Sequence, residues 1–273
     1  MAAPGPSSRR RLSDLARRPD DELGLAEPAL LLAALHGGGG AVDDGLAHFV
    51  QWSTDLGQAT DVDTRAAALA QVLADGHGFH ADTEDGDIAN GDLLWVLEHR
   101  RGNADALGII WLETARRAGW AAEGLAFPTH FLVRLEDADG HRVIVDPFSG
   151  GTVVAPPDLR ALLKAGNGLA AELEPALFAP LGNRDILVRL QDDVKLRLLR
   201  GGELARALAV VEATLILAPD RALLWREAGL MHMRLDNLPA AVAALEQFVA
   251  RTGNGAAKRR TQQLLQEIRG RMS

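Results

Sequence analysis

The sequence predicts an α+β fold built from three successive parts, and three observations lead to this prediction. Apolar residues recur at helical spacing as far as Ala118. Between Gly119 and Pro147 the pattern changes to the alternation that is typical of strands. From about residue 184 the helical spacing returns, and the pattern there repeats. We therefore expect a helical N-terminal region, a core of helix plus antiparallel sheet, and C-terminal helical repeats.

Composition and pattern together indicate the domain boundaries. Residues 1–12 are small, polar and basic, which is typical of a disordered arm. Residues 13–182 hold the helical region and the strands, and residues 183–273 hold the repeats. The segment SSRRRLSDLARR has an alternative interpretation as a nucleic-acid-binding patch. We favour a solvated tail and a helix with Ser13 as its N-cap, because the chain as a whole is acidic.

The composition excludes several classes of function. A net charge of −8 argues against general binding of nucleic acid or of an anionic membrane, because both need a basic surface. No apolar run is long enough to span a bilayer, so we expect a cytoplasmic protein. The chain contains no cysteine, which excludes disulfides, thiolate zinc sites and thiol nucleophiles. We expect no cofactor and no metal site.

Helical periodicity in the N-terminal part indicates a series of helices. The first ends at His36-Gly37, and the segments GLAHFVQWSTDL, TRAAALAQVLAD and DLLWVLEHRRG follow, before a strong helix from about Ala104 to Ala118. In DLLWVLEHRRG we expect Gly102 to cap the helix, with a core formed by Leu93, Leu94, Trp95 and Leu97. The alternative interpretation of this helix end is that Arg100 or Arg101 pairs with a carboxylate.

Two polar motifs resemble known sites but lack a necessary part. HGGGG at residues 36–40 resembles an oxyanion loop of esterases, but the chain has no G-x-S-x-G partner. HADTEDGD at residues 80–87 offers acidic oxygens for calcium, but its spacing does not fit an EF-hand. We therefore expect a helix end and a solvated acidic loop.

The stretch PTHFLVRLEDADGHRVIVDPFSGG holds the strongest candidate site. It follows the strand-like run AAEGLAFP and contains two further predicted strands, THFLVRLED and HRVIVDP. A two-residue loop between them separates His130 from Asp146. A three-residue loop that ends at Gly140 pairs Leu132 with Asp146, which makes His130 and Asp146 diagonal neighbours on one face. Gly140 supplies the left-handed residue that a three-residue loop needs, so the turn favours a His130–Asp146 contact.

Such a pair has two interpretations, and the pattern alone leaves both open. The imidazole, oriented by the carboxylate, can act as a general base. Alternatively, His130 is a core histidine that the backbone satisfies, and Asp146 caps the turn before Pro147.

The C-terminal part contains an internal repeat. When GGELARALAVVE is placed beside LDNLPAAVAALE, Gly202 aligns with Asp236, and leucine, alanine and glutamate positions coincide. The offset, about 34 residues, is the period of the tetratricopeptide repeat, and Pro219 lies where such repeats place proline. The alternative is a generic pair of helical hairpins. We favour the repeat, which implies a surface for a protein partner.

Taken together, these residues resemble a bacterial family. The resemblance rests on Gly78-Phe79, Asn90, VLEHRRG, ETARRAGW, GLAFPTHFLVR and VDPFSGG. The family joins a transglutaminase-like domain to C-terminal tetratricopeptide-like repeats and is often labelled Sir-type. The resemblance covers roughly residues 15–270, and the repeat period supports it independently. Thr129 departs from the family, which has glycine before the histidine.

The resemblance implies a papain-like core in which a cysteine at a helix start works with a histidine and an aspartate. His130 and Asp146 match the histidine and the aspartate, and Ala104 falls on the cysteine position. Alanine has no nucleophilic atom, so thiol acyl transfer lacks its reacting group.

Two hypotheses of function follow. The first is a non-catalytic, pseudoenzyme-like protein that acts as an interaction or regulatory module through its repeats. The alternative is a cysteine-independent hydrolase in which the His130–Asp146 dyad activates water as a general base. The sequence leaves enzyme activity, the partner and the oligomeric state open.

Overall fold

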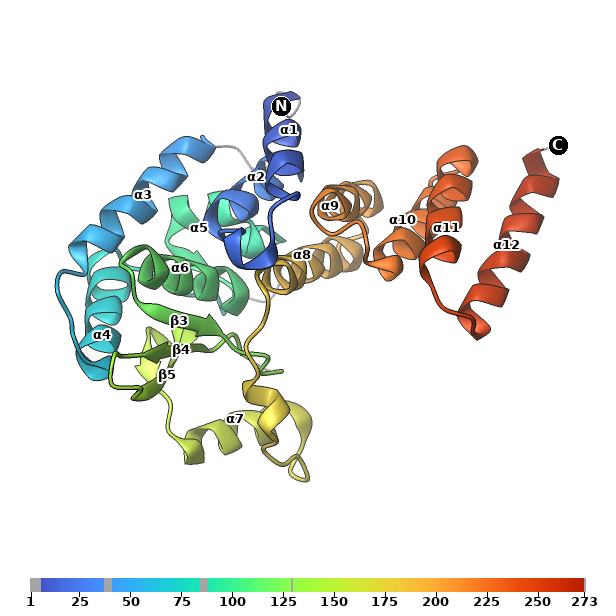
Figure 1. The fold of residues 1–273 in the computed structure, drawn as a ribbon. Coiled ribbons are helices and arrows are strands. Elements are labelled where there is room, and N and C mark those ends of the chain that lie inside the picture. The colour runs from blue at the N-terminus through green and yellow to red at the C-terminus, as the bar shows by residue number, and fades with distance from the viewer. Residues whose placement is uncertain (1–5, 37–40, 84–87, 129, 273) are drawn as a thin grey trace. The chain divides into compact units, whose positions relative to one another are not determined.

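The computed structural model describes residues 6–36, 41–83, 88–128 and 130–272, which form two compact units (Figure 1). The core unit comprises residues 19–34 and 38–190, and the repeat unit comprises residues 1–18, 35–37 and 191–273. The core unit contains helices and a four-stranded antiparallel sheet, which confirms the α+β class. The sequence motifs at residues 1–5, 37–40 and 84–87, and the departure at Thr129, lie outside the described residues.

The helices predicted before Ala118 are all present. They are α2 (Ala26–His36), α3 (Val42–Asp55), α4 (Val62–Leu69) with its π-helical continuation η2 (Ala70–Gly76), α5 (Leu93–His99) and α6 (Ala104–Arg117). Side chains cap three of them: Asp61 accepts a hydrogen bond from Thr64 N, Asp92 from Leu94 N, and Asn103 from Ala106 N. These polar residues begin the helices because they satisfy backbone donors that have no partner within the first turn.

The end of α5 differs from the prediction. Arg100, with a φ of 62°, takes the left-handed cap position that we assigned to Gly102. Gly102 instead forms the short parallel pair β1 (His80–Ala81) with β2 (Arg101–Gly102), where a Cβ would lie 2.9 Å from the Val96 side chain. The glycine is needed for this close approach rather than for the cap. Val96 is fully buried, whereas Trp95 is only half-buried.

The sheet has the order β3-β4-β5-β6, with antiparallel neighbours. Its strands are β3 (Ala121–Gly124), β4 (Val133–Glu136), β5 (Arg142–Asp146) and β6 (Thr152–Val153), of which the sequence missed β6. Val133 pairs with Val145 and Glu136 with Arg142, which is the register of a three-residue loop. Gly140 has a φ of 82°, so the predicted turn is confirmed. The strand β4 begins three residues after His130, later than we expected.

The helix α6 packs across this sheet (Figure 1). A Cβ on Gly108 would overlap the Phe131 ring, and one on Gly124 of β3 would lie 2.7 Å from it. Both distances are shorter than any real contact of a Cβ atom. The Phe131 ring therefore packs directly against the backbone at two positions where only glycine fits. The segment before β4 is therefore fixed against the helix by packing that is sensitive to a single methyl group.

Shorter elements complete the core unit. The sheet edge leads into α7 (Pro156–Asn167), which buries Leu159 and Leu163. The remaining turns are η1 (Asp20–Glu22), η3 (Ile88–Gly91), η4 (Pro147–Ser149) and η5 (Pro175–Phe178).

The repeat unit consists of paired helices. They are α8 (Asn183–Arg200), whose first turns belong to the core unit, α9 (Leu204–Leu217), α10 (Ala222–Arg234), α11 (Leu238–Arg251) and α12 (Ala256–Met272). The offset from the start of α9 to that of α11 equals the offset from α10 to α12, and both match the aligned sequences. The aligned residues Gly202 and Asp236 both have left-handed backbones, with φ of 78° and 58°. On Gly229 a Cβ would lie 2.6 Å from Leu245, so this glycine allows α10 and α11 to approach closely.

The prediction of a disordered arm over residues 1–12 is wrong from Pro6 onward, where α1 (Pro6–Leu15) begins. Leu12 and Leu15 are buried, and α1 contacts α9. Burial of these two leucines stabilises a helix whose arginines alone suggested a solvated tail. Ser13 lies inside the helix, and its hydroxyl donates to Arg9 O instead of capping. Among the described residues, no helix is both long and apolar enough to cross a membrane.

Candidate functional site

The two residues of the predicted dyad lie side by side. His130 Nδ1 is 3.1 Å from Asp146 Oδ2, a contact at ion-pair distance that is not aligned as a straight hydrogen bond. The Asp146 side chain is 2% exposed and that of His130 is 21% exposed. The Phe148 ring meets the imidazole edge to face, with centroids 6.1 Å apart. The carboxylate is thus buried behind an imidazole that reaches solvent.

Asp146 has a second, local role. Its Oδ1 accepts a hydrogen bond from Phe148 N at 3.0 Å, and its Oδ2 accepts one from the Ser149 hydroxyl at 2.8 Å. It therefore caps the turn η4, as one interpretation of the aspartate predicts, and it also contacts His130. Burial by itself raises the pKa of Asp146, but the contact with His130 and the bonds from Ser149 and Phe148 outweigh it. The pKa lies below its usual value, and the group is ionised at neutral pH.

The start of α6 is held near the segment that carries His130. Ala104 is the first residue of the helix and is half-buried. The next residue, Asp105, forms an ion pair with Arg189 at 2.7 Å, and Arg189 Nη1 donates to Phe127 O at 3.0 Å. One turn beyond Ala104, Gly108 receives the Phe131 ring. Two contacts therefore tie the first turns of α6 to residues on both sides of His130.

A groove of about 510 Å³ adjoins the buried aspartate. Asp146, Ser149 and Thr152 contribute polar groups to its wall. The rest of the wall comes from β6 and α7, through Val153, Val154, Asp158, Ala161, Leu162 and Ala165. Such a mainly apolar groove with a few polar groups is typical of a site for an organic ligand.

A larger depression of about 890 Å³ lies elsewhere in the core unit and does not include the dyad. Several of its charged groups are engaged with one another or with the backbone. Glu113 accepts from Leu25 N and from Arg117, and Asp20 accepts from the N–H groups of Asn183 and Arg184 at the start of α8. These bonds give the residues a structural role as caps and clamps.

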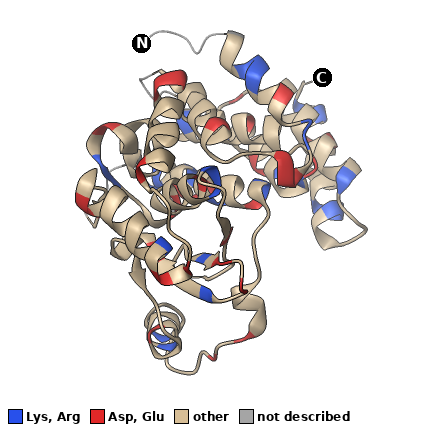
Figure 2. Cartoon of the chain, turned by 60° about the vertical axis from the view of Figure 1, so that its left-hand side comes forward, with Lys and Arg blue, Asp and Glu red and all other residues tan. Residues whose placement is uncertain are grey.

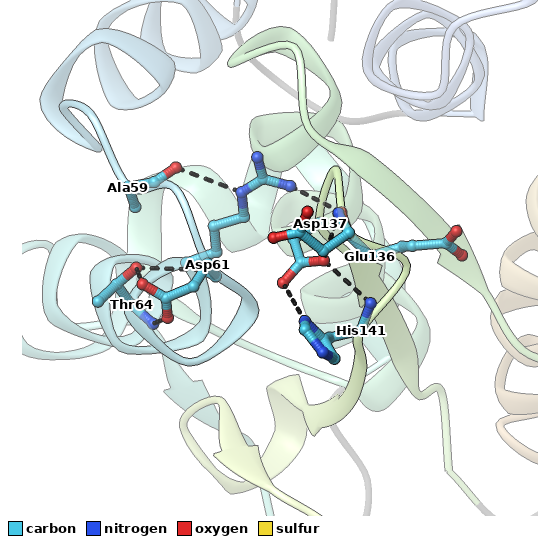
Figure 3. A network of polar contacts seen from close by, with 8 residues as sticks. Ala59, Asp61, Thr64, Glu136, Asp137 and His141 are labelled. Carbon is cyan, nitrogen blue, oxygen red and sulfur yellow. Dashed lines mark hydrogen bonds and ion pairs between the residues drawn. The ribbon is translucent and has the colours of Figure 1, made fainter.

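The tip of the β4–β5 hairpin gathers Asp137, Asp139 and His141, whose possible ligand atoms lie within 4.8 Å of one another (Figure 3). Asp137 Oδ1 accepts from the N–H groups of Asp139 and His141, and its Oδ2 is 3.2 Å from His141 Nδ1. Beside it, Arg65 donates to Glu136 O at 2.7 Å. The carboxylate of Asp137 therefore closes the turn, and a neighbouring guanidinium disfavours a cation there.

Sequence reasoning identified His130 and Asp146 but missed the groups that position them. Ser149 follows Asp146 by three residues, and this spacing of an aspartate and a serine at a turn is a signal that was available. Arg189 had no such signal, because it lies far along the chain from its ion-pair partner Asp105. The arginines at the end of α5 stack on aromatic rings: Arg100 lies over Phe79 and Arg101 over Trp95.

We expect Asp146→Asn to lower the free energy of unfolding by about 1–3 kcal/mol at neutral pH, because charge-assisted bonds are lost. The lowered pKa means that the carboxylate stabilises the fold above the unfolded value of about 4, and that this contribution disappears as the pH falls through the folded pKa. Urea unfolding at a series of pH values should show wild type and variant converging below about pH 4. Asp75→Asn changes an exposed carboxylate and serves as the control, which should leave the free energy of unfolding at neutral pH nearly unchanged. A constant gap for Asp146→Asn at every pH would contradict the assignment.

Comparison with known proteins agrees with this architecture. The transglutaminase-like superfamily matches residues 42–192, and the tetratricopeptide repeat matches residues 194–266. The chain is 32% identical to a UPF0162 protein of Xylella fastidiosa over 60% of its length, and 31% identical to Protein SirB1 of Salmonella typhimurium over 58%. These matches span only 59% and 60% of the relatives' own lengths. The UPF0162 protein YchA of Escherichia coli K12 is 28% identical over 71% of this chain and 72% of its own. The chain belongs to the transglutaminase-like superfamily, and a tetratricopeptide-repeat region follows its transglutaminase-like domain.

Proposed function

We propose that this chain is a non-catalytic member of the superfamily, a cytoplasmic protein that binds a protein partner through its repeats. The observation that carries the proposal is the absence of any cysteine from a chain with a transglutaminase-like domain. The helix α6 begins with alanine at the position that the resemblance assigns to the nucleophile. Thiol acyl transfer has no reacting atom at such a site.

The surface of the repeat unit supports the second half of the proposal. Leu223 on α10 is 68% exposed and Leu196 on α8 is 47% exposed. Large apolar side chains in open positions on regular helices are typical of interaction surfaces when they cluster. Tetratricopeptide repeats in general present such helices to protein partners.

Site-specific photo-crosslinking tests which unit binds the partner. We expect benzoylphenylalanine in place of Leu223 to give a discrete adduct in cells, because the side chain lies on the proposed surface. Leu169 of the core unit is 86% exposed and provides a matched control position. Mass spectrometry identifies the adducts. Adducts at position 169 and none at position 223 would place the interaction on the core unit and contradict the proposal.

A second experiment tests whether Ala104 occupies the nucleophile position. Ala104→Cys and Ala256→Cys each place a single thiol at the first residue of a helix, α6 or α12. We expect the thiol at position 104 to react with iodoacetamide about tenfold faster at mildly acidic pH, because His130 lowers its pKa. Adding His130→Ala should bring the rate back to that of Ala256→Cys. Equal rates in all three variants would mean that the assignment of Ala104 is wrong.

One observation favours a second candidate function, a cysteine-independent hydrolase. The imidazole of His130 is partly exposed, and the ionised Asp146 lies behind it, which is the arrangement of an oriented general base. If this function holds, His130→Ala should reduce the hydrolysis of activated esters by a factor of about 100 or more. Asp75→Ala serves as the control. Equal background turnover by wild type and His130→Ala would leave only the binding role.

A further inference from the structure

Charge is divided very unequally between the two units. The core unit holds 11 basic and 27 acidic residues, a net charge of −16. The repeat unit holds 18 basic and 10 acidic residues, a net charge of +8. The basic residues are blue and the acidic residues red in Figure 2. The net charge of −8 for the whole chain therefore conceals a basic repeat unit. A basic unit attracts anionic ligands, which the net charge of the whole chain would not predict.

Arginine side chains without a hydrogen bond or ion pair lie on one helix of each pair among α8 to α12. Within the described residues of these five helices, they belong to α8, α10 and α12, and they are Arg200, Arg226, Arg234, Arg259, Arg260 and Arg271. The side chains of Arg9 and Arg10 on α1 also have no such partner within the described part of the chain. The second helices differ. On α9, Arg206 pairs with Glu203 at 2.7 Å, and on α11, Arg251 donates to Gln247 and stacks on Trp225. Among the described residues of α8 to α12, the arginines whose side chains have no polar partner therefore lie on the first helix of each pair.

Exposed apolar side chains are found on the same helices. Among the described residues of the repeat unit, the large exposed hydrophobic side chains lie on or directly after α8, α10 and α12: Leu196, Leu223, Leu235 and Met272. The helices α9 and α11 carry none within that range. The first helix of each pair is therefore both cationic and apolar on its exposed side.

The repeat period brings leucine and arginine onto a common face. Leu196, Leu230 and Leu264 follow one another at intervals of one repeat period and occupy the same repeat position, as do Arg226 and Arg260. On α10, Arg226 lies three residues after Leu223 and four before Leu230, so the three side chains share one face. Arg260 and Leu264 have the same four-residue spacing on α12. The same pairing thus occurs in successive repeats.

We propose that this face binds an acidic, amphipathic polypeptide segment, whose carboxylates pair with Arg226 and Arg260 while its apolar side chains cover Leu196 and Leu223. This inference rests on the proposed function and names the chemistry of the partner. Desolvated arginines and leucines together give such a segment both charge complementarity and apolar burial. Nucleic acid is complementary only to the arginines, because its phosphates gain no favourable contact with the exposed leucines. In addition, the core unit has a net charge of −16, which repels a long polyanion.

Fluorescence anisotropy with the full-length chain tests the proposal. The probe is a synthetic peptide in which leucine and glutamate recur at helical spacing. One comparison peptide has glutamine for each glutamate, a second has serine for each leucine, and a single-stranded DNA oligonucleotide supplies charge alone. We expect the Leu/Glu peptide to bind at least about tenfold more tightly than either altered peptide, and to weaken as salt is added.

Variants locate the binding. Arg226→Glu with Arg260→Glu should weaken binding of the Leu/Glu peptide by about tenfold or more. Arg206→Glu with Arg160→Glu makes the same change in net charge on α9 and α7 and should have little effect. Leu196→Ser with Leu223→Ser provides an independent test that leaves charge unchanged and should also weaken binding. Thermal unfolding establishes that each variant is folded.

Several results would overturn this inference. If the glutamine peptide binds with the same affinity as the Leu/Glu peptide, the carboxylates have no role in binding. If Arg206→Glu with Arg160→Glu weakens binding as much as Arg226→Glu with Arg260→Glu, the effect of charge is not specific to this face. Tighter binding of the oligonucleotide, lost in Arg226→Glu with Arg260→Glu, would assign the face to nucleic acid. Adducts at position 223 without binding of the acidic peptide would leave the proposed function standing and reject only this partner chemistry.

Discussion

The contact between the Phe131 ring and the backbone of Gly108 is the constraint on which the core unit depends. The ring occupies the volume where any other residue at position 108 carries its Cβ, so α6 and the segment before β4 meet at backbone distance. His130 precedes that ring, and Ala104 lies one turn before that glycine. Arg189 adds a second tie, because it contacts Asp105 on the helix and Phe127 on the segment. The arrangement of the candidate site follows from these contacts.

The His130–Asp146 dyad is compatible with a chain that lacks a thiol, because Asp146 also has a structural role that does not involve catalysis. It caps the turn η4 through Phe148 N and receives the hydroxyl of Ser149, so the carboxylate is needed where the sheet ends. A buried carboxylate that lost these partners would carry an uncompensated charge, which is strongly unfavourable. A His–Asp contact can therefore persist for stability, and its presence alone does not require catalysis.

The two units have opposite charge and different kinds of surface. The core unit has a groove beside Asp146, whereas the repeat unit offers leucines and uncompensated arginines on the first helix of each pair. The net charge of the whole chain hides this division. An anionic ligand that the acidic core unit repels can still be attracted by the basic repeat unit. The charge of each unit, not that of the whole chain, therefore sets which ligands its surface attracts.

The sequence by itself determined the features that depend on local chemistry. Asp92 and Asn103 start helices because their side chains satisfy free backbone donors, Gly140 selects the loop and hence the register, and the repeat period marks the paired helices. It also determined that no thiol exists.

Only the tertiary structure decided features that arise from distant contacts. The helix α1 forms because its leucines are buried in the repeat unit, which the C-terminal helices complete. In the sequence, the arginines around these leucines conceal this burial. Arg100, not Gly102, caps α5, and Gly102 is needed instead because the Val96 side chain fills the space where its Cβ would lie. The pairing of Arg189 with Asp105, and the arginines left without carboxylate partners, depend on which side chains the fold brings within reach. An ion pair forms only between groups a few ångströms apart in space, and a sequence pattern records distance only along the chain.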